Sequence, residues 1–397
     1  MNFGRRQFGC ALCGITVLAF MEGALARGAD TTPAEARVEP PLPPGYRPPA
    51  GSDEQGLWSM MDRAERELKS SRFIVRDPQL NAYVRDIVCR LGKDHCPDMR
   101  IYIVRTPHFN ASMAPNGMMQ VWTGLLLRCN DEAQLSAVLG HEMGHYLRRH
   151  SLKGYRDARN KSNISTFLSL GLFAAGAGAA ANITDLALLA SFFAFNRDQE
   201  READQIGLDL MTKAGYAPLA APEVWEQLRA ELAASTAKRS KDVLFATHPD
   251  IEERLKTLDK SARNRDPGAV DRGRDRYLAS LGGMREQIVR DELALRQYGR
   301  SEVVFDRLLA QTPDDGMLWY AKGEVYRLRG EPDDAARALQ AYVKGLQAQG
   351  APPETYRSIL LVEVKQGAKD RARTALESYL KAKPDASDAE ALRMLMN

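Results

Sequence analysis

The chain has 397 residues, more than one hydrophobic core usually supports, so we expect two folded domains plus tails. Its 55 basic and 52 acidic residues give a formal net charge of +3, and this balance excludes a nucleic-acid partner attracted by bulk charge. A hydrophobic fraction of 44% beside 27% charged residues excludes a protein with many membrane spans.

The N-terminus has the features of an export signal. Arg5 and Arg6 precede an apolar stretch from Phe8 to Met21, and Ala24-Leu25-Ala26 has the small residues of a cleavage site. The apolar stretch is shorter than the roughly 20 residues that a spanning helix needs. We therefore predict that residues 1–26 are a cleaved signal peptide. The arginine pair also resembles a twin-arginine signal, so the export route stays open.

The next segment is a linker, followed by two helices. Residues 27–52 are rich in proline among small and charged residues, so we expect no packed structure there. From Leu57 to Leu91 the apolar residues have helical spacing, interrupted at Asp77-Pro78. Proline suits the first turn of a helix, so a second helix is expected to begin at this point.

Two strands and a turn are predicted between these helices and the central motif. The run of β-branched and aromatic residues from Arg100 to Arg105 indicates a strand. Asn116-Gly117 is a strong hairpin turn signal, and Met118 to Trp122 form the strand that follows it.

The cysteines outside the signal peptide allow one disulfide. Cleavage removes Cys10 and Cys13 and leaves three cysteines in a compartment where disulfides persist. Cys89 and Cys96 are the closer pair and flank a turn, so we expect them to be joined, with Cys129 as a buried thiol.

A helix beginning at Asp131 carries the motif His141-Glu142-Met143-Gly144-His145 and continues towards His150. Residues four apart lie on one helix face, so both imidazoles can bind one metal ion with Glu142 beside them. This is the ligand spacing of a catalytic zinc site, in which the glutamate acts as general base towards the attacking water.

Small residues on the motif helix allow a neighbouring element to come close. Ala137, Gly140 and Gly144 provide this room where a third ligand must enter.

The segment that follows the motif, Ile164 to Phe195, is almost free of charge. We interpret it as a buried helical hairpin, because glycines and polar residues interrupt it; a membrane span, or a lid in peripheral contact with a membrane, is the alternative.

A second helix supplies the third ligand. The metzincin pattern is excluded, because Arg148 and Ser151 stand where it requires glycine and histidine. Glu200 and Asp204 lie one turn apart on one face of an acidic segment, and Glu200 is the preferred ligand, with Glu202 as its rival. Asp204 can accept the free N–H of a ligand histidine and fix its ring.

His248 stands just before Pro249 at the start of another predicted helix. Three roles are open for it. It can cap the helix, it can occupy the open metal position and keep the site latent, or it can stabilise the oxyanion of the tetrahedral intermediate.

The C-terminal third repeats itself at a spacing of 37 residues, which indicates stacked helical hairpins. These hairpins resemble tetratricopeptide repeats, and we expect about three units over residues 285–397, after a linker over 263–284. The residues that recur are Trp319, Gly330, Ala335, Leu339 and Tyr342, matched by Tyr356, Gly367, Ala372, Leu376 and Tyr379.

The motif, the Glu200-x-x-x-Asp204-x-x-Gly207 pattern and Thr247-His248-Pro249 together resemble the HtpX-like and CaaX-prenyl-protease-like metallopeptidases over residues 53–262. The added signal peptide and repeats are similar to the periplasmic BepA-like members of that family. The resemblance implies one zinc per chain, with ligands His141, His145 and Glu200, catalytic Glu142 and supporting Asp204. It also implies a role in outer-membrane protein assembly and quality control.

The expected fold is therefore predominantly α: an α+β, zincin-like peptidase domain with a small sheet, followed by an α-solenoid of helical hairpins. The leading hypothesis is a periplasmic zinc endopeptidase that cleaves unfolded or stalled envelope proteins, with the repeats recruiting the outer-membrane assembly machinery. The alternatives are a scaffold or chaperone with a largely latent protease, and a membrane-inserted protease. We expect substrate to pair, extended and antiparallel, with the strand Met118 to Trp122.

Overall fold

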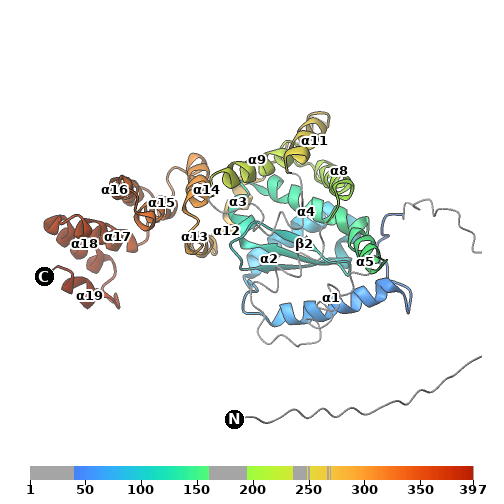
Figure 1. The fold of residues 1–397 in the computed structure, drawn as a ribbon, viewed down its shortest axis with the longest axis horizontal. Coiled ribbons are helices and arrows are strands. Elements are labelled where there is room, and N and C mark those ends of the chain that lie inside the picture. The colour runs from blue at the N-terminus through green and yellow to red at the C-terminus, as the bar shows by residue number, and fades with distance from the viewer. Residues whose placement is uncertain are drawn as a thin grey trace, which may run out of the picture. The chain divides into compact units, whose positions relative to one another are not determined.

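The computed structural model describes residues 40–160, 195–235, 248, 251–265, 268 and 270–396. These residues are mostly helical and form one three-stranded sheet, which confirms the predicted fold class (Figure 1). The predicted signal peptide, and all of Ile164 to Phe195 except Phe195 itself, lie outside the described residues. Within the described ranges, no helix combines the length and the apolar character needed to cross a membrane.

The sheet has the strand order β1-β3-β2. Strand β1 (Arg100–Val104) runs parallel to β3 (Met118–Trp122), and β2 (Ala111–Met113) runs antiparallel to it. The predicted turn at Asn116-Gly117 is confirmed, and it joins β2 to β3. Gly117 has φ 87°, a conformation that glycine adopts without steric cost, and its N–H donates to the carbonyl of Ala114 at 2.9 Å.

The prediction that substrate pairs with Met118 to Trp122 is wrong. This strand, β3, lies at the centre of the sheet, is hydrogen-bonded on both sides and has all five residues buried. A hairpin signal identifies one neighbour of a strand but not a second neighbour reached by a crossover. The outer strand on this side of the sheet is β2, which packs against the motif helix α4 (Glu132–Leu147).

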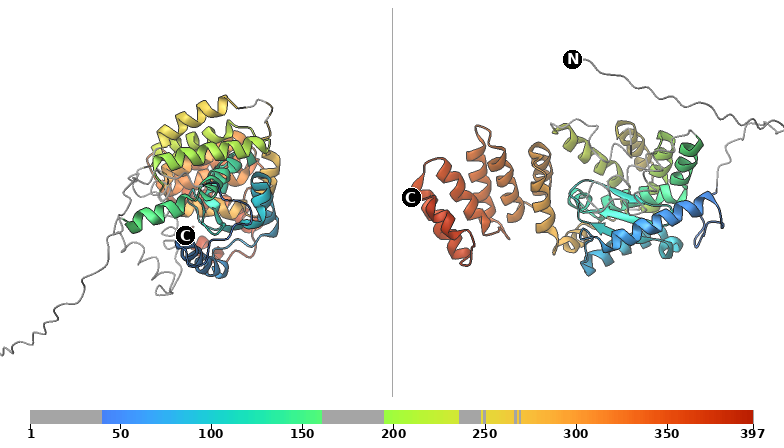
Figure 2. Two further views of the ribbon diagram at one scale, coloured as in Figure 1. Left: turned by 90° about the vertical axis from the view of Figure 1, so that its right-hand side faces the viewer. Right: turned by 60° about the horizontal axis from the view of Figure 1, so that its bottom comes forward.

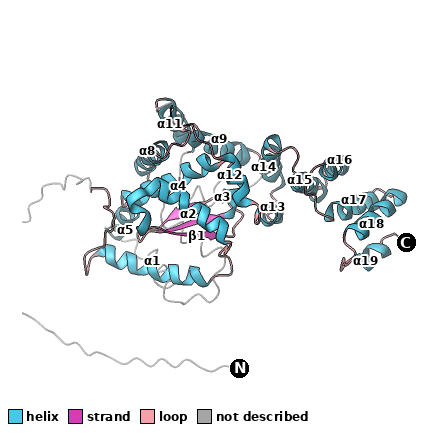
Figure 3. Cartoon of the chain, turned by 180° about the vertical axis from the view of Figure 1, so that it is seen from behind, coloured by secondary structure: helices cyan, strands magenta, loops and turns pink. Residues whose placement is uncertain are grey.

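Helices cover both faces of the sheet. Successive side chains of a strand point to opposite faces, and all five residues of β3 are buried, so each face must be covered. Met118 and Trp122 of β3 pack in one apolar cluster with α1 (Asp53–Ser70). Met119 and Val121 point the other way, into the main core that includes residues of α2 (Pro78–Gly92). Helices α1 and α4 accordingly lie on opposite sides of the strands when the molecule is seen from the back (Figure 3).

The two predicted N-terminal helices are α1 and α2. The chain starts α2 as expected, with Pro78 in its first turn and the Asp77 side chain accepting from the Leu80 N–H at 2.8 Å. The expectation of an unpacked linker over 27–52 is wrong for its described part. Leu42 is buried, and its N–H donates to the carbonyl of Leu147 at the end of α4.

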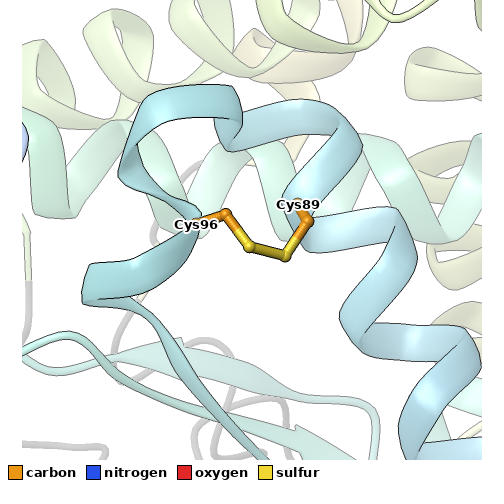
Figure 4. The surroundings of a disulfide bond; sticks show 2 residues. All are labelled: Cys89 and Cys96. Atoms are coloured by element: carbon orange, nitrogen blue, oxygen red, sulfur yellow. A yellow bond between two sulfur atoms is a disulfide. The ribbon is translucent and has the colours of Figure 1, made fainter.

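The predicted disulfide is confirmed. It joins Cys89 in α2 to Cys96 in the short 3-10 helix η1 (Lys93–Asp98), with the Cα atoms 4.7 Å apart (Figure 4). The bridge therefore closes the turn between α2 and β1. Cys129 is buried and is not part of a disulfide.

Helical hairpins form the C-terminal third (Figure 2). The 37-residue spacing corresponds to the pairs α15/α16 and α17/α18. Gly323 is required where the first pair meets, because a Cβ there would lie 2.3 Å from the Tyr342 ring. The bounds of these helices are α13 Arg285–Ala294, α14 Tyr298–Gln311, α15 Gly316–Arg329, α16 Asp334–Gln347, α17 Glu354–Lys365, α18 Lys369–Ala382 and α19 Ala389–Met394.

The segment 263–284, expected to be a linker, contains helix α12 (Arg274–Leu281). Tyr277 on this helix is buried, and its hydroxyl donates to the carbonyl of Leu126 in α3 (Thr123–Arg128). This segment is therefore packed against the part of the chain that carries the motif.

A buried charge network ties α3 and α9 (Ala220–Ala233) to α13 and α14. Arg128 lies 2.8 Å from Glu231 and 2.9 Å from Glu292, and Arg300 lies 2.7 Å from Glu231. Each of these side chains is at most 7% exposed, so every charge depends on its partner for compensation.

Glu231→Gln tests this network. The change keeps the size of the side chain but leaves Arg128 and Arg300 facing each other without the carboxylate between them. We expect the free energy of unfolding to fall by about 3–5 kcal/mol, the cost of breaking a buried ion pair, measured by urea denaturation. The matched control is Glu226→Gln on the same helix, where the exposed pair with Arg229 contributes at most about 1 kcal/mol. Equal unfolding midpoints for the two variants would show that the buried ion pairs of Glu231 do not stabilise the fold.

Candidate active site

The motif lies on α4, a helix that is buried from Glu132 to Tyr146. The helix starts as predicted, because Asp131 accepts from the Gln134 N–H at 2.9 Å. It ends at Leu147 and does not reach His150. Arg149 has φ 54°, a left-handed conformation that interrupts the helical path, and His150 begins the next helix, α5 (His150–Asn160).

Helix α8 (Arg197–Lys213) packs closely on α4 through small residues. A Cβ on Gly140 would lie 3.0 Å from the carbonyl oxygen of Gly207, and a Cβ on Gly144 would lie 2.9 Å from Cα of Ala203. A Cβ on Gly207 would lie only 2.6 Å from the main-chain nitrogen of His141. The prediction that small residues admit a second element beside the motif is therefore confirmed for Gly140 and Gly144.

Four side chains converge where these helices meet. His141 and His145 point from α4 and Glu200 points from α8, and His248 reaches the same place from the segment before α11 (Ile251–Arg263). One donor atom from each lies within 4.8 Å of the others, and all four residues are buried. Glu202, the rival ligand, is outside this group.

The distances in this cluster suit a metal ion. The Nε2 atoms of His141 and His145 are 3.0 Å apart, and they lie 3.6 and 3.4 Å from the Glu200 carboxylate oxygens. Two ligands bound at 2.0–2.1 Å in tetrahedral geometry are about 3.3 Å apart. Oε2 of Glu200 is buried without a hydrogen bond, because Arg254 Nη1, although 2.9 Å away, is not aligned to donate to it. Two imidazoles and an unsatisfied carboxylate oxygen are a donor set that fits a divalent metal.

Asp204 holds the ring of His141. Its Oδ1 lies 2.8 Å from His141 Nδ1, so the proton of His141 belongs on this nitrogen and the lone pair on Nε2 faces the cluster. Although burial acts against ionisation, the adjacent Arg254 guanidinium keeps the pKa of Asp204 below its usual value. The predicted contact between Asp204 and a cluster histidine is therefore present in the structure.

Arg254 on α11 is the central residue that the sequence did not reveal. Its Nε and Nη2 atoms donate to the two carboxylate oxygens of Asp204 at 2.8 and 2.6 Å. Its guanidinium also lies over the ring of Trp225 on α9, 4.1 Å from the ring centre. One buried cation thus balances two buried carboxylates, Glu200 and Asp204. The helical phase of α11 was the only sequence signal for this residue.

Glu142 lies beside the cluster. It is buried, and its Oε1 is 3.6 Å from His248 Nε2. Burial raises the pKa of the Glu142 carboxyl, and the opposing effect of His248 and His141 does not cancel this rise. A carboxylate of raised pKa is a better proton acceptor, which is what a general base requires.

His150 and Phe195 complete the surroundings of His145, and the sequence pattern indicated no role for either residue. His150 Nδ1 lies 2.9 Å from His145 Nδ1. The Phe195 ring is stacked on the His145 ring at 3.7 Å between centres. A histidine five residues after the motif, in a chain with six histidines, was the available signal.

Comparison with known proteins agrees with this site. Residues 60–262, just over half of the chain, match the model of Peptidase family M48. The chain belongs to peptidase family M48. Residues 287–352 match a tetratricopeptide repeat model. The family assignment and the predicted resemblance are therefore confirmed.

Relatives match this chain over different lengths. The Beta-barrel assembly-enhancing protease of Escherichia coli K12 is 27% identical over 292 residues, 71% of this chain and 55% of that protein. The Mitochondrial metalloendopeptidase OMA1 of Schizosaccharomyces pombe is 33% identical over 161 residues, 40% of this chain and 45% of that protein. The chain thus spans about half the length of these two relatives.

Gly207→Ala tests the close contact between α4 and α8. The added methyl group must push the helices apart, which moves Glu200 away from the two histidines. We expect metal content to fall and the protein to lose roughly 1–3 kcal/mol of stability, as overpacking typically costs. Gly56→Ala in α1 is the control, because its Cβ would meet no atom within 4 Å; helix propensity should leave it unchanged or up to about 1 kcal/mol more stable. The same metal content and stability in both variants would show that the contact does not set the site.

Proposed function

We propose that this M48 peptidase is a zinc-dependent endopeptidase with one zinc ion per chain. His141, His145 and Glu200 are its proposed ligands. The observation that carries this proposal is the buried convergence of these three side chains beside Glu142. Imidazole and carboxylate ligands suit zinc, and three protein ligands leave a position for substrate chemistry.

The residues of the chain divide the proposed chemistry between them. A bound zinc ion would act as a Lewis acid and lower the pKa of water. Glu142 accepts the proton from the attacking water and delivers it to the leaving amine, for which its raised pKa is suited. Asp204 keeps His141 in the tautomer that presents Nε2, and Arg254 fixes the Asp204 carboxylate.

Three variants test the ligands and the base. Glu142→Gln should keep one zinc per chain and lose cleavage of a casein-like substrate, because the amide cannot accept a proton. Glu200→Ala should lose zinc, whereas Glu202→Ala should still hold one zinc per chain at micromolar metal. Elemental analysis and a protease assay on the full chain measure both properties. Zinc loss from Glu202→Ala with retention in Glu200→Ala would reverse the ligand assignment, and full activity of Glu142→Gln would remove the proposed base.

We propose further that the substrates are unfolded or stalled envelope proteins. Relatives that carry the name Beta-barrel assembly-enhancing protease support this role, as do the repeats, which offer a surface for a partner in outer-membrane assembly. The predicted signal peptide supports export to the periplasm. The proposed organisation is a peptidase domain over 53–262 and a repeat domain over 285–397.

A latent protease with a scaffold function is the second candidate, and His248 favours it. His248 Nδ1 lies 2.9 Å from Glu200 Oε1 and 3.4 Å from His141 Nε2, so the side chain stands where a fourth ligand would be. A neutral imidazole in that position would exclude water from a bound metal ion. Rescue of an envelope defect by Glu142→Gln as fully as by the wild type would support the scaffold function over the protease.

His248→Ala decides between the roles of this residue. If His248 blocks the metal, the variant should cleave a casein-like substrate several-fold faster than the wild type. If it stabilises the oxyanion, kcat should fall by about 100-fold or more. His95→Ala, outside the cluster, is the control and should leave cleavage unchanged. The same rates for His248→Ala and the wild type would leave only the capping role.

A further inference from the structure

The turn after the motif brings a third histidine to the back of the cluster. Arg149 adopts φ 54°, which ends the helical path of α4, and His150 follows it in contact with His145. His150 has no exposed surface, and its Nδ1 lies 2.9 Å from His145 Nδ1. It therefore contacts the side of the His145 ring that faces away from the other donor atoms.

The hydrogen bond between His145 and His150 has a defined donor if His145 uses Nε2 as a ligand. A neutral imidazole with a free lone pair on Nε2 carries its proton on Nδ1. His145 must then donate, and Nδ1 of His150 must accept. A neutral His150 that accepts at Nδ1 carries its own proton on Nε2, so it must donate from that atom.

A carboxylate stands where this second proton points. Oε2 of Glu202 lies 3.0 Å from His150 Nε2, and its Oε1 lies 2.5 Å from Arg148 Nε. The Phe195 ring covers one face of His145, in a stack tilted by 16°. The chain of contacts from His145 to His150 to Glu202 thus has a donor and an acceptor at each step.

We propose that His150 is a positioning residue, which connects His145 to the Glu202 carboxylate and so fixes the ring and tautomer of this ligand. The inference rests on the proposed zinc function. The Nδ1 atom of His141 contacts a carboxylate directly, that of Asp204, whereas Nδ1 of His145 contacts His150, which in turn contacts the Glu202 carboxylate. Glu202, the rival ligand by sequence, therefore supports the metal indirectly.

Zinc affinity of the full chain, measured by competition with a chelator, tests this role. His150→Leu removes the acceptor and should weaken zinc binding by about 10–100-fold, as loss of such a partner typically does. His150→Asn can place an amide oxygen where Nδ1 stood, and should restore affinity to within about threefold of the wild type. The absorption spectrum of the cobalt-substituted protein should change in His150→Leu and return towards the wild type in His150→Asn.

A second pair of variants covers the case in which His150→Leu does not fold. Glu202→Gln leaves the buried core intact and should weaken zinc binding several-fold. Asp198→Asn, an exposed acidic residue on the same helix, should not change it. If Glu202→Gln and a folded His150→Leu both bind zinc with wild-type affinity, the positioning role of His150 is overturned and the proposed zinc function stands. Equal losses of zinc affinity in His150→Leu and His150→Asn would overturn the same role. A wild-type chain that binds no zinc would overturn the proposed function itself.

Discussion

The close approach of α4 and α8 is the constraint on which the site depends. The two histidines lie on one helix and Glu200 on another, far along the chain. They meet only because Gly140 faces Gly207 and Gly144 faces Ala203, with no side chain large enough to separate the backbones. Packed helices are usually 8–10 Å apart, depending on the side chains between them, and small residues in the contact allow a close approach. The side chains of the site can therefore meet because the backbones of α4 and α8 pack closely.

Burial then sets the electrostatic requirements. Glu142, Glu200 and Asp204 are all buried, and uncompensated charges in such a place are costly. Arg254 contributes the fixed positive charge opposite two of them, and Trp225 supports its guanidinium from α9. Helix α9 also carries Glu231, which lies in the buried charge network with α13 and α14. The same helix therefore contacts both the site and the first repeat helices.

The sequence was sufficient for features that depend on local spacing. His141 and His145 are four residues apart on one helix, and the Asn116-Gly117 turn is encoded in two residues. The helical repeats were predicted from their fixed period of 37 residues. Asp204 was found because it lies one helical turn from Glu200. Each of these features can be derived from the geometry of one element.

Features that depend on how separate elements meet were missed. Arg254 and His150 belong to no recognisable sequence motif. Arg254 reaches the site because α11 packs against α8, and His150 reaches it because of the turn at Arg149. The central position of β3 arises because β1, reached by a crossover, adds a parallel neighbour that no turn signal specifies. Leu42 was assigned to a linker because the surrounding residues are rich in proline, and one apolar residue among them does not indicate packing. Its side chain is nevertheless buried.

Two imidazoles from α4 and one carboxylate from α8 are the proposed ligands of a single zinc ion. X-ray absorption at the zinc edge of the purified full-length chain tests this assignment most directly, because the spectrum reports the atoms bound to the metal. We expect nitrogen and oxygen ligands only, at about 2.0–2.2 Å, with the multiple scattering of imidazole rings. Sulfur ligands at about 2.3 Å, or a spectrum without imidazole features, would contradict it.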